Sequence, residues 1–309
     1  MTDLTIPARD EALAAVPGYR DTTAALALVR RRRAELPIPN PGETLRALVN
    51  DVADAARAGR LPDADELSRR AHEAEHGGEA AAAQLRVLDQ AATILRTEAD
   101  QRLRAGAEHG IAALGPRVEH ILARVRDIAP TLGGVRTAEQ AVTATPDARD
   151  AYTELVRLVD AYTDTRRAHH WLLSLAWPSD GPQWAGGSSM RYFAEVANVD
   201  ELWPSWPNGY RPGREVSNTH LDLTTGTLAA PPWPTTSDPV TATYDTEYLL
   251  WAASTQDAQV WVPTAQQVRD AYAQAVDAVQ KRERQAEKRA GRTDTPADPR
   301  REFVYVQPE

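Results

Sequence analysis

The sequence predicts a mainly α protein with a long antiparallel, coiled-coil-like helical hairpin and a smaller, irregular α+β module rich in Trp and Pro. Apolar residues recur at spacings of three and four over residues 81–99 and 111–128, the heptad pattern of packed helices. A third periodic stretch, 146–176, follows the turn at Gly133-Gly134. All eight Trp lie between residues 171 and 261, among frequent Pro and Gly, where helical periodicity disappears.

These patterns divide the chain into four segments. We expect short N-terminal helices and a linker over 1–61, the hairpin over 62–176, the Trp/Pro-rich module with a final helix over 177–290, and a mobile tail with a docking strand over 291–309. The linker is the stretch ELPIPNPGE, because each Pro fixes its own φ and disfavours helix in the residue before it.

The hairpin prediction depends on the two seams of apolar residues. The first contains Ala81, Leu85, Leu88, Ala92, Leu95 and Ala99, and the second contains Ile111, Leu114, Val118, Ile121, Val125 and Ile128. Between them the spacing is four at each step, a stutter that relaxes a left-handed supercoil. Pro116 is expected to kink the second helix or to begin a new one. The residues most expected to carry association are Leu88, Leu95, Ile111, Val118 and Val125.

The module is expected to combine short strands with a final helix. Strands are predicted over 216–223 and 227–229, and also over 248–252 and 259–262. Thr264 and Gln267 form a capping-box pattern that starts a helix reaching about residue 290. The Trp residues are interpreted first as the core of the module. A partner-protein surface and a carbohydrate or ligand platform are the alternatives, with Trp203, Trp206 and Trp233 as the interaction candidates.

One motif suggests metal chemistry. Residues 72–76 read HEAEH, which on a helix places His72 and His76 one turn apart for zinc, with Glu73 as general base. Glu98 is the candidate third ligand. Two features oppose this zinc site, since Glu75 adds a charge and two glycines directly after the motif weaken the helix. The sequence therefore favours a solvated helix face, with a zinc-dependent hydrolase as the alternative function.

Three other stretches have ordinary explanations that we favour. The run Arg30–Arg33 suits the C-terminal end of a helix, although contact with nucleic acid is an alternative. His169 and His170 are adjacent, so on a helix they point about 100° apart and cannot readily share a metal. Residues 186–190, GGSSM, lack the second Gly of a nucleophile elbow and are read as a loop.

Composition excludes several classes of function. With 42% hydrophobic and 26% charged residues the chain is ordinary globular material. The absence of Cys excludes disulfides and thiolate metal sites. No signal peptide and no apolar run long enough to span a membrane are visible. The net charge is −9, and residues 177–262 carry three basic and ten acidic groups, which argues against a nucleic-acid surface there.

Residues 136–173, RTAEQAVTATPDARDAYTELVRLVDAYTDTRRAHHWLL, resemble segments of uncharacterised helical proteins of actinobacterial phages and mobile elements. The resemblance implies a virion-associated or mobile-element setting and transfers no functional residue. We predict a non-enzymatic structural, assembly or protein-interaction protein that self-associates through its helical seams and uses no cofactor. Its expected partner is a second copy or another protein, and its expected location is the cytoplasm, or the virion if a phage encodes it.

Overall fold

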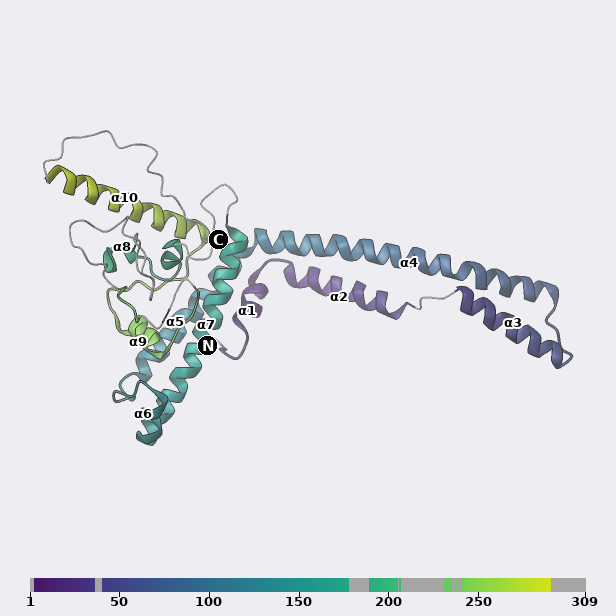
Figure 1. Ribbon diagram of the computed structural model, residues 1–309, viewed down its shortest axis with the longest axis horizontal. Helices are drawn as coiled ribbons and strands as arrows, with labels where there is room; N and C mark the ends of the chain where they lie inside the picture. The colour runs from purple at the N-terminus through teal and green to yellow at the C-terminus, as the bar shows by residue number, and fades with distance from the viewer. Residues whose placement is uncertain are drawn as a thin grey trace, which may run out of the picture. The chain divides into compact units, whose positions relative to one another are not determined.

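The computed structural model describes residues 3–36, 41–177, 189–204, 206, 231–234, 237 and 241–289 (Figure 1). The prediction of a mainly α protein is confirmed, because these residues form helices and include no β-strand. Their one isolated β-bridge joins Val196 to Val260. The strands predicted over 216–223 and 227–229, and the tail from 291, lie outside the described residues.

The strand predicted over 248–252 is wrong. These residues belong to helix α9 (Thr246–Ser254), whose first turn is capped by Asp245, a side chain that accepts a hydrogen bond from the Tyr248 amide at 2.8 Å. The stretch also contains Leu249, Leu250 and Ala252, which are good helix formers, and none of its five residues is β-branched. Of the strand predicted over 259–262, the structure contains only the bridge at Val260.

The chain forms two compact units. Unit 1 is Met1–Ala12 together with Ile111–Glu309, and unit 2 is the continuous stretch Leu13–Gly110 between them. The boundaries fall within α1 (Ala8–Ala15) and α5 (Ala107–Ile128). Unit 2 is therefore an insertion into unit 1 in terms of chain order.

Unit 2 pairs one long helix with two shorter ones. Helix α4 (Ala64–Ala105) runs antiparallel to α2 (Tyr19–Glu35) and α3 (Pro41–Arg57), which cover successive parts of its length (Figure 1). Gly18 lies beside Arg102, Arg33 forms an ion pair with Asp89, and Asp51 forms one with Arg70, so residue numbers fall along α4 as they rise along α2 and α3. This order fixes one register for the whole unit.

Helix α4 ends at a glycine that the heptad spacing does not reveal. Gly77 and Gly78 lie inside the helix, but Gly106 caps it, donating its amide to the Arg102 carbonyl at 2.8 Å. A Cβ at Gly106 would lie 2.8 Å from the Val16 side chain. The predicted stutter within one continuous helix is therefore not present. Helix α4 ends at Ala105, and α5 begins at Ala107, directly after the Gly106 cap. Helix α5 then continues through Pro116, so no new helix begins there.

Unit 1 is built mainly from α5 and α7 (Pro146–Ala176), with α6 (Ala138–Thr143), α8 (Val199–Leu202), α9, α10 (Ala265–Arg289) and the 3₁₀ helix η1 (Ser189–Ala194). Arg117 bonds Thr165 and Arg124 bonds Glu154, so α5 and α7 are antiparallel. The single hairpin predicted over 62–176 is thus divided, since α4 pairs with α2 and α3 in unit 2. The predicted capping box of α10 is confirmed, with Thr264 and Gln267 bonding reciprocally at 2.8 and 3.2 Å.

Candidate functional site

The residues of the HEAEH motif lie on α4, where the His72, Glu73 and His76 side chains are exposed. The two imidazole rings share a face, with centroids 4.4 Å apart. Glu98 lies farther along the same continuous helix, about 33 Å from His76 at roughly 1.5 Å per residue, and it pairs with Arg102 at 2.6 Å. No group of three His, Asp or Glu side chains in the described residues could hold a metal ion. The structure therefore brings the two His together without the third ligand.

The two predicted seams are covered within the chain. Leu88 and Leu95 are partly buried on the face of α4 that meets α2. Ile111, Val118 and Val125 are 0%, 2% and 0% exposed inside unit 1. Neither seam is free for a second chain in this structure. Association between copies would have to use other residues or require part of a unit to open.

The Trp candidates lie in the core of unit 1. Trp203, Trp206 and Trp233 are at most 4% exposed. Trp203 packs edge-to-face on Trp233, with centroids 5.5 Å apart, and Trp206 packs edge-to-face on Phe193 at 5.0 Å. These contacts agree with the core interpretation, in which large aromatic side chains provide the buried area that the few Leu and Ile of this segment do not.

Arg30–Arg33 form the exposed end of α2. Arg33 is paired with Asp89 of α4, and Arg32 lies 3.5 Å from Glu35. Part of this positive charge is therefore compensated within unit 2. The run helps to join α2 to α4, a structural role that suits its place at a helix C-terminus.

The surface that stands out is the exposed apolar surface of unit 2. Nine large apolar side chains are exposed among the described residues, and six of them belong to this unit: Leu28, Leu45, Val49, Leu61, Val87 and Ile94. Val87 and Ile94 are 66% and 59% exposed and lie two helical turns apart on α4. Exposed apolar side chains that gather on one element are typical of a protein-binding surface.

Val87 and Ile94 belong to a second heptad pattern on α4, which we name the outer seam. Its members are Ala83, Val87, Gln90, Ile94, Thr97 and Gln101, all of them exposed. Their spacings alternate between four and three, and none is charged. Helix α4 thus has one seam covered by α2 and another open to solvent. The outer seam gives a weak signal in the sequence, because its members are less apolar than those of the covered seam.

Unit 1 contains a buried ionic cluster around Glu195. The Glu195 carboxylate lies 2.8 Å from Arg166 Nε and 3.0 Å from His170 Nε2, and it accepts a hydrogen bond from the Tyr244 hydroxyl at 2.7 Å. Arg166 and Glu195 are both 0% exposed. Arg166 also donates to the Trp261 carbonyl at 2.8 Å. The cluster joins α7, η1 and the segment before α10, so we assign it a role in holding these elements together.

The pKa values of this cluster follow from burial and from its own charges. Burial raises the pKa of Glu195, but Arg166, His170 and Tyr244 outweigh it and bring the pKa to about 2. Burial, together with the charge of Arg166, lowers the pKa of His169 to about 3. His169 Nε2 lies 2.8 Å from the Pro263 carbonyl, which can only accept, so this nitrogen carries the proton. At neutral pH Glu195 is ionised and His169 is neutral.

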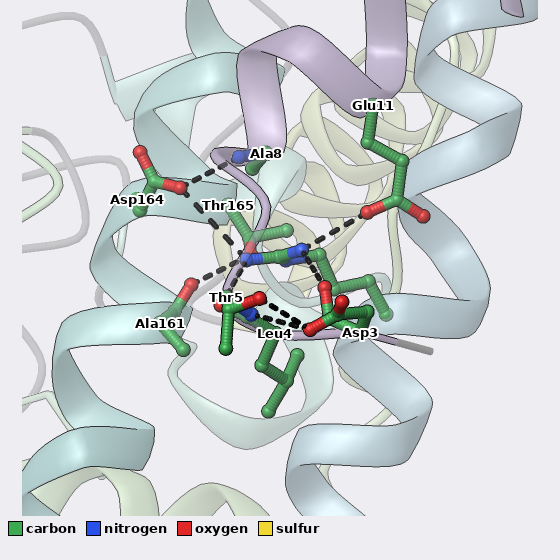
Figure 2. A network of polar contacts seen from close by, with 9 residues as sticks. Asp3, Leu4, Thr5, Ala8, Glu11, Ala161, Asp164 and Thr165 are labelled. Carbon is green, nitrogen blue, oxygen red and sulfur yellow. Dashed lines mark hydrogen bonds and ion pairs between the residues drawn. The ribbon is translucent and has the colours of Figure 1, made fainter. Parts of the chain in front are cut away.

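A second buried cation, Arg117 of α5, holds the N-terminal segment of the chain. Figure 2 labels its partners from residues 3–11 and from α7. Nη1 donates to the Asp3 carbonyl at 3.3 Å and to the Glu11 carboxylate at 3.0 Å, and Nη2 donates to the Leu4 carbonyl at 3.3 Å. Nε donates to the Thr165 hydroxyl at 3.0 Å. Arg117 is only 1% exposed, so these contacts replace its hydration.

Neither buried arginine was singled out from the sequence. Arg166 lies between Tyr162 and His169 at helical spacing, which places a charge inside the apolar stripe of α7. That position is a signal of a buried, paired charge. Arg117 lies directly before Val118 of the second seam and gives no such signal, because its partners come from the far N-terminus.

Comparison of the chain with protein-family models, curated proteins and solved structures finds no match. Within the described residues, no helix is both long enough and apolar enough to cross a membrane.

Proposed function

We propose that the protein is a non-enzymatic structural or assembly protein that binds other protein chains through the helices of unit 2. The observation that carries this proposal is the outer seam, in which Val87 and Ile94 stay largely exposed on an uncharged heptad face. A heptad face of this kind can pack against a second helix, because the side chains of each helix fit into the spaces between the side chains of the other. Resemblance of residues 136–173 to phage and mobile-element proteins supports an assembly of that type.

The arrangement of unit 2 favours a helical partner. Because α2 covers one face of α4, a partner helix on the outer seam would complete a three-helix arrangement around α4. Leu45 and Val49, one turn apart on α3, are two further exposed apolar side chains of unit 2 that a partner could cover. Unit 2 cannot bury these side chains itself, because α2 and α3 form a single layer against α4.

The expected strength of the contact is modest. Burying a Val or Ile side chain that is exposed in the free protein contributes about 1–2 kcal/mol, so Val87 and Ile94 together supply about 2–4 kcal/mol. Leu45 and Val49 would add a similar amount if the partner reaches α3. Such energies are typical of reversible contacts or of one contact among many in an assembly.

The test compares two double variants of the full chain. Val87→Glu with Ile94→Glu places two charges on the outer seam, and Ala82→Glu with Thr93→Glu places two charges on exposed positions of α4 outside it. Sedimentation velocity across a wide concentration range, and chemical crosslinking in the cells that produce the protein, measure its complexes. We expect the first variant to lose them and the control to keep them, with unchanged circular dichroism.

Two results would contradict the proposal. The first is an identical set of complexes for both variants and the unmodified chain. The second is stoichiometric zinc in protein purified without a His tag, lost in His76→Ala, which would favour the hydrolase alternative.

A further inference from the structure

We propose that the face of α5 and α7 around Arg117 is a binding site for a turn segment that continues into a helix. Residues 3–12, which we name the strap, fill this site here, and we infer that the strap of a second copy can fill it in exchange. The inference uses other residues than the outer seam and does not depend on the proposed function.

The chemistry of the site fits a peptide backbone. Arg117 donates to the carbonyls of two successive residues, Asp3 and Leu4, at 3.3 Å each. Leu4 and Thr5 form a turn, in which the Asp3 carbonyl also accepts from the Ile6 amide at 3.4 Å, and this turn presents two adjacent carbonyls to one guanidinium. With the strap in place Arg117 is 1% exposed, and its neighbours from α7 are Thr165 at 3.0 Å and Asp164 at 3.9 Å. Most of its acceptors therefore come from the strap, so the site favours a ligand that supplies carbonyls and a carboxylate.

The other end of the site recognises the start of a helix. Asp164 accepts a hydrogen bond from the amide of Ala8, the first residue of α1, at 2.7 Å (Figure 2). A carboxylate at a helix N-terminus also interacts favourably with the helix dipole. Ala8 and Ala12 are both 0% exposed, so the first turn of the ligand must carry small residues on this face. Glu11, 3.0 Å from Arg117, supplies the charge.

These contacts define the ligand class. It is a turn followed by a helix, with small residues at the buried positions of Ala8 and Ala12 and an acid in the first helical turn. The sequence DLTIPARDEALA has these features in the order that the site requires. The Arg9 guanidinium, 3.9 Å from the Trp171 ring centroid, adds a cation–π contact from the solvent side of the helix.

The chain order makes this ligand exchangeable. Residues 1–12 are connected to the rest of unit 1 only through unit 2, residues 13–110, and the chain has no disulfide to fix them. A strap from another copy can therefore make every contact that the chain's own strap makes. The chain's own strap has the advantage of an intramolecular connection to the site through residues 13–110. Exchange is expected at high protein concentration or when the chain's own strap is weakened, and reciprocal exchange of an identical element links two copies.

The experiment mixes two full-length variants. A strap-defective chain carries Ala8→Glu and Glu11→Lys, which place a carboxylate against Asp164 and a cation against Arg117 without altering α5 or α7. An acceptor-defective chain carries Asp164→Lys, at a side chain that is 46% exposed. In the mixture, the intact strap of the second chain can dock on the intact site of the first. We expect a one-to-one complex by sedimentation in the mixture and monomers for each variant under the same conditions.

A peptide of residues 1–16 with a fluorescent label provides the second readout. It is expected to bind the strap-defective chain, and Glu11→Lys in the peptide is expected to weaken binding about 100-fold. Asp10→Lys in the peptide is the matched control, because Asp10 is exposed on the same helix, next to Glu11 in sequence. The peptide assay does not need the Asp164 variant, so it stays informative if that variant fails to fold. A mixture that sediments as two monomers, or equal binding of the two substituted peptides, would overturn the proposal.

Discussion

Glu195→Gln is the substitution that most directly tests the account of unit 1. The change keeps the size of the side chain and removes its charge, while Arg166 stays 0% exposed beside it. Removing one partner of a buried ion pair leaves the other charge uncompensated, which costs about 3–5 kcal/mol. The pKa of Glu195 gives a similar magnitude, because a carboxyl whose pKa falls from 4.5 to about 2 on folding stabilises the protein by about 3 kcal/mol.

The pH dependence provides a second, independent readout. Since the pKa of Glu195 is lowered on folding, this carboxylate's contribution to the free energy of unfolding is fully present above pH 4.5 and is lost as the pH falls toward 2. The unmodified chain is therefore expected to lose about 3 kcal/mol from this group across that window. Glu195→Gln removes this part of the acid sensitivity, so the two stability curves should converge at low pH.

The assay is urea unfolding followed by Trp fluorescence, which reports on unit 1 because all eight Trp lie between residues 171 and 261. Glu154→Gln is the matched control, since Glu154 pairs with Arg124 at 2.6 Å but its side chain is 36% exposed. A partly exposed pair of this kind contributes about 0–1 kcal/mol. The reasoning would be refuted if Glu195→Gln cost less than about 1 kcal/mol at pH 7, or no more than the control.

Three further substitutions test smaller parts of the structure by thermal and urea unfolding. Gly115→Ala should stabilise α5 by about 0.5–1 kcal/mol, because a Cβ there meets no heavy atom within 4 Å; a loss would contradict this. Gly106→Ala should destabilise unit 2 by about 1–3 kcal/mol through its clash with Val16, and a neutral result would disprove the close approach. His169→Gln can still donate a hydrogen bond to the Pro263 carbonyl. We expect this variant to lose less stability than the unmodified chain as the pH falls from 6.5 to 4, because keeping the buried imidazole neutral costs up to about 1.4 kcal/mol per pH unit over this range. An unchanged slope would show that His169 titrates normally.

The sequence predicts the helical faces better than their partners. Heptad spacing places Leu88 and Val118 on faces that are partly or fully buried, and Thr264 with Gln267 correctly marks the start of α10. Spacing fixes which side of a helix is apolar, but several helices can cover that side. For this reason the sequence could not show that α2 and α3, instead of the returning helix α7, lie along α4.

The remaining differences have local or long-range causes. A short apolar run such as 248–252 suits a strand or a helix, and the Asp245 cap decides for the helix. The end of α4 depends on Val16 lying against Gly106, a contact between residues far apart in the chain. Arg117 and Glu195 depend in the same way on partners in other elements, so their burial has no local signature. The candidate binding site for the strap was accordingly absent from the sequence analysis.

The division of unit 1 around unit 2 affects the order of events during synthesis. Unit 2 is a continuous stretch, so all its residues exist once Gly110 is added, whereas the strap binds Asp164, which is added later. At roughly 5–20 residues per second, this interval lasts on the order of 3–10 s. The first residues to leave the ribosome therefore wait for their binding site, and neighbouring chains on one messenger RNA hold free straps at the same time.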